Sequence, residues 1–218
     1  MRIALSLVSF ALCVPLAAQT SWKVQKTTSL LLGVDAVDSL NCWAGGGLSG
    51  LGATVWRTRD GGATWTQTYG GLDFAGMVMD LDMVDRQVGW ASGLGLPGQS
   101  GLAMTADGGR TWTEQSPAPL GFFANAWQDV FALDRSHVWV VGTWVGLGTG
   151  EGLSASSDGG KTWKFTDTKT MVGTSARYCW FRDPLNGWLA SGQFPSSNSP
   201  NLPYKGVISV TSDGGKTW

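Results

Sequence analysis

The sequence has few charged residues, a single histidine, and no long apolar run after its first residues. Charged residues make up 14% of the 218 positions. Once Arg2 is set aside from the 15 basic residues, 14 face 16 acidic ones. This balance leaves no excess of positive charge of the kind that binds nucleic acid. One histidine, His137, cannot supply a metal cluster, so no metal is expected.

The N-terminal residues predict a secretory signal peptide. Arg2 is followed by an apolar run from Ile3 to Val14, and then by Pro15 and small residues. The run is much shorter than the ~20 residues that span a bilayer, so a membrane anchor is the less favoured alternative. We therefore expect residues 1–18 to be removed and residues 19–218 to form an exported domain without a membrane span.

Glycine and tryptophan are abundant, with 32 and 13 residues, and many of them belong to one repeated phrase. The phrase Ser/Thr-x-Asp-Gly-Gly-x-Thr-Trp occurs four times, at intervals of 47, 51 and 55 residues. The Asp-Gly-Gly core predicts a tight hairpin turn in which the glycines take positive φ and the carboxylate accepts backbone N–H groups. The tryptophan is expected to fold back over the turn. The structural residues of the four phrases are Asp60, Trp65, Asp107, Trp112, Asp158, Trp163, Asp213 and Trp218.

A second tryptophan marker has the same period of about fifty residues. Each such tryptophan follows an aspartate by five positions, and this aspartate is expected to cap the turn between two strands. The pairs are Asp38 and Trp43, Asp85 and Trp90, Asp134 and Trp139, and Asp183 and Trp188. Two markers with one period indicate a repeat protein.

Each period divides into four short strands, without a helical pattern. In the second repeat we expect strands at Val78–Val84, Val88–Gly93, Ser100–Ala106 and Arg110–Gln115. The prediction is an all-β fold, a β-propeller of four-stranded blades. The expected blades cover about residues 27–70, 71–116, 117–168 and 169–218. Cys42 and Cys179 fall in the first and fourth repeats, so they are expected to stay unpaired.

Residues 20–26 resemble the segments that contain the last Thr-Trp of the repeated phrase and the residues just after it, at 64–67 and 111–114. They are therefore expected to form the outer strand of a closing blade. The fourth repeat already enters its own outer strand at Trp218, and a blade with a bare edge is disfavoured. We expect these blades to be part of a seven-bladed ring, with a closed four-bladed ring as the alternative.

The repeated phrase resembles the Asp-box, or bacterial neuraminidase repeat. This repeat occurs in sialidases, xyloglucan-degrading hydrolases, sortilin-type receptors, and the photosystem II stability and assembly factor family. The phrase Gly-Trp-Ala-Ser-Gly upstream of the box makes the chain most similar to the assembly factor family. That resemblance implies a seven-bladed propeller that binds a protein partner through a positively charged face. Arg57, Arg59, Arg177 and Arg182 form no evident cluster in the sequence.

Catalytic residues are hard to find in the sequence. The repeated acids are assigned to turns, which leaves Asp73, Glu151 and Asp167 in predicted loops as candidate acids for glycoside hydrolysis. Asp80 and Asp129 occupy matching places on the innermost strands and are expected to line the channel. Two Gly-x-Gly-x-x-Gly matches are followed by strands and not by helices, so no nucleotide cofactor is expected.

The predicted function is non-catalytic binding of a protein partner or a polysaccharide. The loops between second and third strands, and those between blades, are expected to form one face that carries exposed aromatics. The candidate ligand-binding residues on this face are Phe74, Phe122, Phe123, Trp144, Phe194 and Tyr204. The alternative is an Asp-box glycoside hydrolase, sialidase-like or xyloglucanase-like, with part of its catalytic site in further blades.

Overall fold

The structure is a computed structural model that describes residues 24–26, 28, 30–48, 52–71, 74–96, 98–117, 124–145, 149–168, 175–193 and 205–218. These residues form fifteen β-strands, and each strand pairs with its neighbours in antiparallel fashion. The all-β prediction is confirmed. The expected signal peptide lies outside the described residues. No helix among the residues described is long and apolar enough to cross a membrane.

The strands form four groups that follow one another along the chain. The first group is β1 (Leu31–Ala36), β2 (Cys42–Leu48), β3 (Gly52–Thr58) and β4 (Thr66–Gly71). The second is β5 (Met77–Met83), β6 (Gly89–Leu94), β7 (Leu102–Thr105) and β8 (Thr113–Glu114). The third is β9 (Ala124–Ala132), β10 (Val138–Val145), β11 (Thr149–Ser156) and β12 (Lys164–Asp167). The fourth is β13 (Ser175–Phe181), β14 (Gly187–Gln193) and β15 (Lys205–Thr211).

The first three strands of the second repeat lie close to their expected positions, whereas its fourth strand is shorter. The second repeat was expected to resume its strand at Arg110, but β8 covers only Thr113–Glu114. The reason is local, because the carboxylate of Asp107 holds the backbone N–H of Thr111 in the turn. Residues 110–112 therefore belong to the turn and not to the strand.

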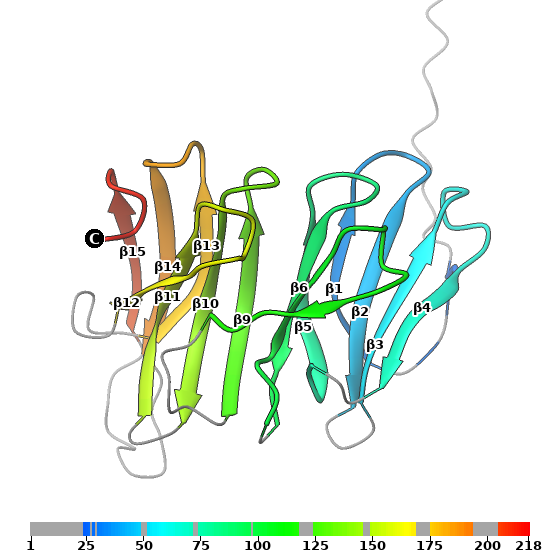
Figure 1. The fold of residues 1–218 in the computed structure, drawn as a ribbon, viewed down its shortest axis with the longest axis horizontal. Helices are drawn as coiled ribbons and strands as arrows, with labels where there is room; N and C mark the ends of the chain where they lie inside the picture. Colours follow the sequence, from blue (N-terminus) through cyan, green and yellow to red (C-terminus); the bar gives the residue numbers. More distant parts are fainter. Residues whose placement is uncertain are drawn as a thin grey trace, which may run out of the picture.

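The four groups stand side by side in chain order, each turned relative to the last (Figure 1). Their first strands, β1, β5, β9 and β13, contact one another in sequence and form the inner edge of the array. A single bridge between Leu94 and Ala126 also joins the second and third groups into one hydrogen-bonded sheet. The first strand of each repeat is thus the innermost, as expected.

The apolar core lies in the seams between neighbouring groups. Trp43, Val55 and Val78 pack in the first seam, and Trp90, Leu102 and Trp127 in the second. The third seam contains Trp139, Leu153, Phe181 and Leu189. In the first and third seams the marker tryptophan also donates its indole N–H to the next repeat, Trp43 to the carbonyl of Gly108 and Trp139 to that of Gly214. The seams therefore join each repeat to the next.

The remaining elements of the sequence prediction have mixed outcomes. Cys42 and Cys179 are free thiols, as expected, and Cys179 is buried. Residues 24–26 are described but are not in a strand, so the closing strand at residues 20–26 stays a prediction. Gln25 does contact the first repeat, since its amide donates to the carbonyl of Gly61 at 3.3 Å.

Candidate functional site

The repeated phrase forms the same turn in all four repeats. In the first, Thr58 donates to the Asp60 carboxylate at 2.8 Å and accepts the N–H of Gly62. Asp60 also accepts the backbone N–H and the hydroxyl of Thr64, at 2.9 and 2.6 Å. Gly61 and Gly62 have φ of 69° and 90°, values that favour glycine. The equivalent hydrogen bonds recur at Asp107, Asp158 and Asp213.

These hydrogen bonds occupy the turn carboxylates and keep them ionised. The hydroxyl and backbone N–H of Thr64 lower the pKa of Asp60 to about 2, and Thr162 does the same for Asp158. A carboxylate whose oxygens already accept several hydrogen bonds is poorly suited to transfer a proton at neutral pH. The turns therefore have a structural role in this geometry.

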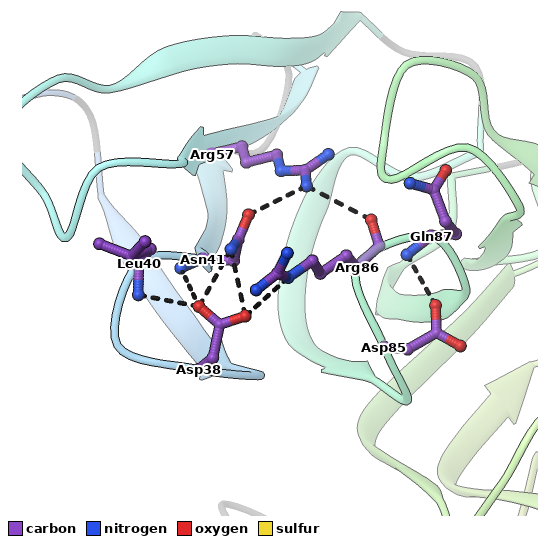
Figure 2. Close-up of polar contacts among 7 residues, drawn as sticks. All are labelled: Asp38, Leu40, Asn41, Arg57, Asp85, Arg86 and Gln87. Carbon is purple, nitrogen blue, oxygen red and sulfur yellow. Dashed lines mark hydrogen bonds and ion pairs between the residues drawn. The ribbon is translucent and has the colours of Figure 1, made fainter.

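The second set of aspartates caps the turns between first and second strands. Asp38 accepts the N–H groups of Leu40 and Asn41 at 2.8 and 2.9 Å. Arg86, from the next repeat, donates to the same carboxylate at 2.8 Å (Figure 2). The pattern continues one repeat further, where Arg135 pairs with Asp85 at 2.7 Å. The caps at Asp38 and Asp85 are therefore also ion pairs between repeats, whereas Asp134 and Asp183 pair with His137 and Arg182 of their own repeat.

Arg57 is the most deeply buried cation among the residues described. It comes from β3 and is 5% exposed. Its guanidinium donates to the carbonyl of Arg86 and to the side chain of Asn41 (Figure 2). It also donates to the carbonyl of Gly108 at 2.9 Å. The same group lies over the Trp43 ring, 4.3 Å from the centroid. It contacts no carboxylate, and its buried Nε–H has no hydrogen-bond partner.

Arg57 opens onto a pocket of about 410 Å³ at the seam between the first and second repeats. The other lining residues are Arg59, Thr64, Thr66, Gln67, Thr68 and Arg110. Burial lowers the pKa of Arg57, and the positive charges of Arg59 and Arg110 lower it further. Neither Arg59 nor Arg110 forms an ion pair with any residue in the described part of the chain. We call Arg57, Arg59, Arg110 and the lining threonines the arginine pocket.

Three guanidinium groups and several hydroxyls around one pocket suit an oxyanion. Guanidinium binds carboxylate, sulfate or phosphate through paired, charge-assisted hydrogen bonds. An incoming anion would also relieve the repulsion that lowers the pKa of Arg57. The expectation that the arginines form no cluster is wrong for Arg57 and Arg59, which meet Arg110 here.

The positions of these three arginines relative to the repeated turns are visible in the sequence. Arg59 precedes the aspartate of the first turn, and Arg110 follows the second glycine of the second turn. Arg57 directly precedes the first turn. Placing consecutive turns next to each other, as a radial array requires, would have brought these three residues together.

The candidate aromatic residues lie mostly where no side chain can be described. Phe122, Phe123, Phe194 and Tyr204 lie outside the described residues, as does the side chain of Trp144 in β10. Phe74 is 2% exposed, and its ring packs 5.0 Å from Tyr69 and 6.1 Å from Trp112. Phe74 therefore belongs to the first seam in this structure, and binding by the other five stays a prediction.

Two of the three candidate acids lie among the described residues. Asp73 lies outside the described residues. Glu151 and Asp167 were expected in loops but lie in β11 and β12, because β11 already pairs with β10 from Thr149 and β12 pairs with β11 as far as Asp167. The only histidine, His137, lies in the turn before β10 and pairs with Asp134 at 2.9 Å. No group of three potential metal ligands occurs among the described residues.

Asp80 and Asp129 lie on the inner strands β5 and β9, as expected, and are half-buried. Their carboxyl groups hydrogen-bond to each other. Each also accepts a backbone N–H from the following repeat, Asp80 from Val130 at 3.2 Å and Asp129 from Cys179 at 2.8 Å. The pair therefore joins neighbouring repeats at the inner edge.

Comparison with known proteins gives similarity in structure only. No protein-family model matches the chain, and a search of curated proteins finds no match. An α-L-arabinofuranosidase from Fusarium graminearum, solved with an iminosugar inhibitor, has a TM-score of 0.53 and 13% identity over 85% of this chain and 64% of that one. A GH74 enzyme from Niastella koreensis has a TM-score of 0.51 and 13% identity over 86% of this chain and 37% of that one. YCF48 bound to a D1 peptide has a TM-score of 0.46 and 21% identity over 65% of this chain and 38% of that one.

The fold is a β-propeller. Three groups of four strands and one of three, arranged radially with their first strands innermost, support this conclusion together with the similarity to the two enzymes. The four groups of strands are propeller blades, and the turns at Asp60, Asp107 and Asp158 join the two outer strands of a blade. The chain spans less than two thirds of the length of these solved structures, and at this identity the similarity extends to the fold alone.

Proposed function

We propose that this chain is an exported, non-catalytic propeller that binds an acidic segment of a protein partner in the arginine pocket. The observation that carries the proposal is the set of three arginines around one pocket without a carboxylate partner. Burial and the neighbouring charges of Arg59 and Arg110 destabilise the charged form of Arg57, and a bound carboxylate would offset this destabilisation. Arg57 is held in place by hydrogen bonds to two repeats, and Arg59 and Arg110 are exposed.

A protein partner is favoured over a polysaccharide for two reasons. Neutral glycans are bound mainly by exposed aromatic platforms, and the arginine pocket contains none. The repeated phrase is also most similar to that of the photosystem II stability and assembly factor family, which binds a protein partner. The acidic segment would be a run of Asp or Glu side chains or a free C-terminal carboxylate.

The glycoside hydrolase alternative has little support from the carboxyl groups of the described residues. A retaining enzyme needs its two carboxyls ~5–5.5 Å apart, and an inverting one needs a wider gap. Asp80 and Asp129 are hydrogen-bonded to each other, which is too close for either mechanism. The turn aspartates have their oxygens occupied by threonines.

Export follows from the predicted signal peptide at residues 1–18. The proposal places the mature domain in the periplasm, in a lumen or outside the cell. An alkaline-phosphatase fusion to residues 1–20 tests this point, because the phosphatase is active only after export. Activity that survives replacement of the Ile3–Val14 run by polar residues would contradict it.

The binding proposal is tested with a fluorescent hexaglutamate peptide with a free C-terminal carboxylate. Anisotropy at low ionic strength should give saturable binding that weakens as salt rises. The double substitution Arg59→Gln with Arg110→Gln should weaken binding at least tenfold. Loss of one charge-assisted hydrogen bond costs ~1.5–3 kcal/mol, which is already tenfold or more.

The matched control is Lys161→Gln with Lys216→Gln. These exposed lysines occupy the same turn position as Arg110 in the third and fourth repeats, so this variant has the same net charge as the arginine variant. Equal loss of affinity in both variants would mean that only net charge matters, and would reject the pocket. Tighter binding of polygalacturonate than of the peptide would reject the protein partner. Hydrolysis of xyloglucan or arabinan by the parent would restore the enzyme alternative.

A further inference from the structure

Aspartates on the innermost strands join each blade to the next. Asp35 of β1 accepts the backbone N–H of Met83 in β5 at 2.7 Å. Asp82 of β5 accepts that of Ala132 in β9 at 2.7 Å. Asp80 and Asp129 make the equivalent contacts to β9 and β13. Each hydrogen bond spans 48 to 50 residues, which is one repeat. The inner edge is therefore held by carboxylates at every seam in the described residues.

Two of these carboxylates meet. Asp80 and Asp129 hydrogen-bond to each other across the seam between blades two and three. A carboxylate without a proton is only an acceptor, so the contact between these two carboxyl groups is a hydrogen bond only while one of them carries a proton. We call Asp80 and Asp129 the axial pair.

The titratable groups that face the axial pair are all acidic. They are Asp35 from β1, Asp82 from β5 and the thiol of Cys179 from β13. No lysine, arginine or histidine among the described residues forms an ion pair with these aspartates. With no positive charge to offset it, a second negative charge at the pair is disfavoured both by burial and by repulsion.

We propose that the axial pair is a proton-dependent latch between blades two and three, and that loss of its shared proton loosens the inner edge of the propeller. With the proton present, the two carboxyls bridge the seam. Without it, two adjacent carboxylates repel each other while each still accepts an N–H from the next blade. This property concerns the whole fold and does not depend on the arginine pocket.

The direction of the pH dependence follows from the protonation states. Burial raises the pKa of Asp82 and of Asp129 to about 7, well above the ordinary value of 3.8. Between these two values the folded protein binds more protons than the unfolded chain, so stability falls as pH rises through this window. The turn aspartates give a pH dependence of the opposite sign. Their pKa values are lowered in the folded protein, so they reduce stability only as pH falls below about 4.

The first test is thermal unfolding between pH 4.5 and 8.5. The parent should lose about 4–8 °C in Tm across this range, the shift expected of one or two titrating groups in a domain of this size. Asp80→Asn keeps the shape and can donate to Asp129 at every pH. Asp82 also titrates in this window, so the comparison is made with Asp82→Asn in both proteins: Asp82→Asn alone should keep a slope, and Asp80→Asn with Asp82→Asn should have a nearly flat Tm. Asp183→Asn, which changes an exposed cap in the fourth blade, should retain the slope of the parent.

The second test needs no variant and decides the matter if Asp80→Asn fails to fold. Carboxyl carbons of the parent, labelled at Asp, are titrated by NMR. Asp80 or Asp129 should titrate near neutral pH, and the exchange protection of the Val130 and Cys179 amides should fall at least tenfold above that point. If Asp80 and Asp129 both titrate below pH 5, or if Tm is constant from pH 4.5 to 8.5, the latch does not exist.

Discussion

At the scale of single residues, this chain uses aspartate for three different purposes. The turn aspartates accept hydrogen bonds within their own blade. The cap aspartates Asp38 and Asp85 accept hydrogen bonds from backbone N–H groups of the turn that follows β1 or β5. Each also pairs with an arginine of the next blade. The axial aspartates accept backbone N–H groups across a seam. The environment of each, and not the residue type, determines its pKa and its role.

The turn aspartates give a prediction for stability at acid pH. In Asp158→Asn the amide nitrogen cannot accept the Thr162 hydroxyl, which now donates to the carboxylate at 2.6 Å. The variant should therefore be less stable than the parent at pH 7, as measured by urea unfolding. The difference should shrink as pH falls from about 4 toward 2, because the pKa of Asp158 is lowered to about 2 and the parent then protonates the same group. A difference independent of pH would contradict this account.

The turn tryptophans give a second residue-level prediction. Trp112 packs on Phe74 in the first seam and donates its indole N–H to the carbonyl of Gly109. Trp112→Ala should lower the free energy of unfolding by ~3 kcal/mol, the range typical of a large aromatic removed from a core. Trp180→Ala is the control, because this side chain is 52% exposed and should cost ~1 kcal/mol or less. Equal effects in urea unfolding would mean that Trp112 is not part of the seam.

At the scale of strands and blades, most of the fold could be predicted from the sequence. Two markers with one period set the number and order of strands, because each marker has a local physical meaning as a turn. The boundaries of the fourth strands could not be predicted, since the carboxylate of Asp107 holds residues of the expected strand in the turn. The positions of Glu151 and Asp167 were misjudged because the strands β11 and β12 extend beyond the pattern.

The close approach of blades gives a prediction for glycine. A Cβ at Gly45 in β2 would lie 2.5 Å from a methyl group of Val78 and 2.8 Å from one of Leu81, both in β5. Gly45→Ala should therefore overpack the first seam and cost ~1–3 kcal/mol. Gly206→Ala in β15, where a Cβ would meet no atom within 4 Å, should leave stability unchanged or slightly raised. Chemical unfolding of both variants checks this, and a neutral Gly45→Ala would show that the seam can adjust.

At the scale of the whole molecule, the sites could be predicted less well than the fold. The arginine pocket joins Arg57 and Arg59 to Arg110 across two repeats. Residue spacing does not show such a contact until the blades are placed side by side. The axial aspartates were expected on the inner strands, but the contact between them depends on how far one blade is rotated against the next. Phe74 was expected on an open face and instead packs in the seam between the first two blades, because burying its apolar ring there is favourable.

The central claim is that the arginine pocket binds a carboxylate, and NMR of the labelled 23.1 kDa chain tests it most directly. Hexaglutamate peptide is added while the Arg Nε–H resonances and the backbone amides are followed. The account predicts that the Nε–H of Arg57, which has no partner now, shifts on binding. Amide shifts should be confined to residues 57–68 and 105–112. Saturable binding with shifts on β14 and β15 instead, or no shift of the Arg57 Nε–H, would contradict the account.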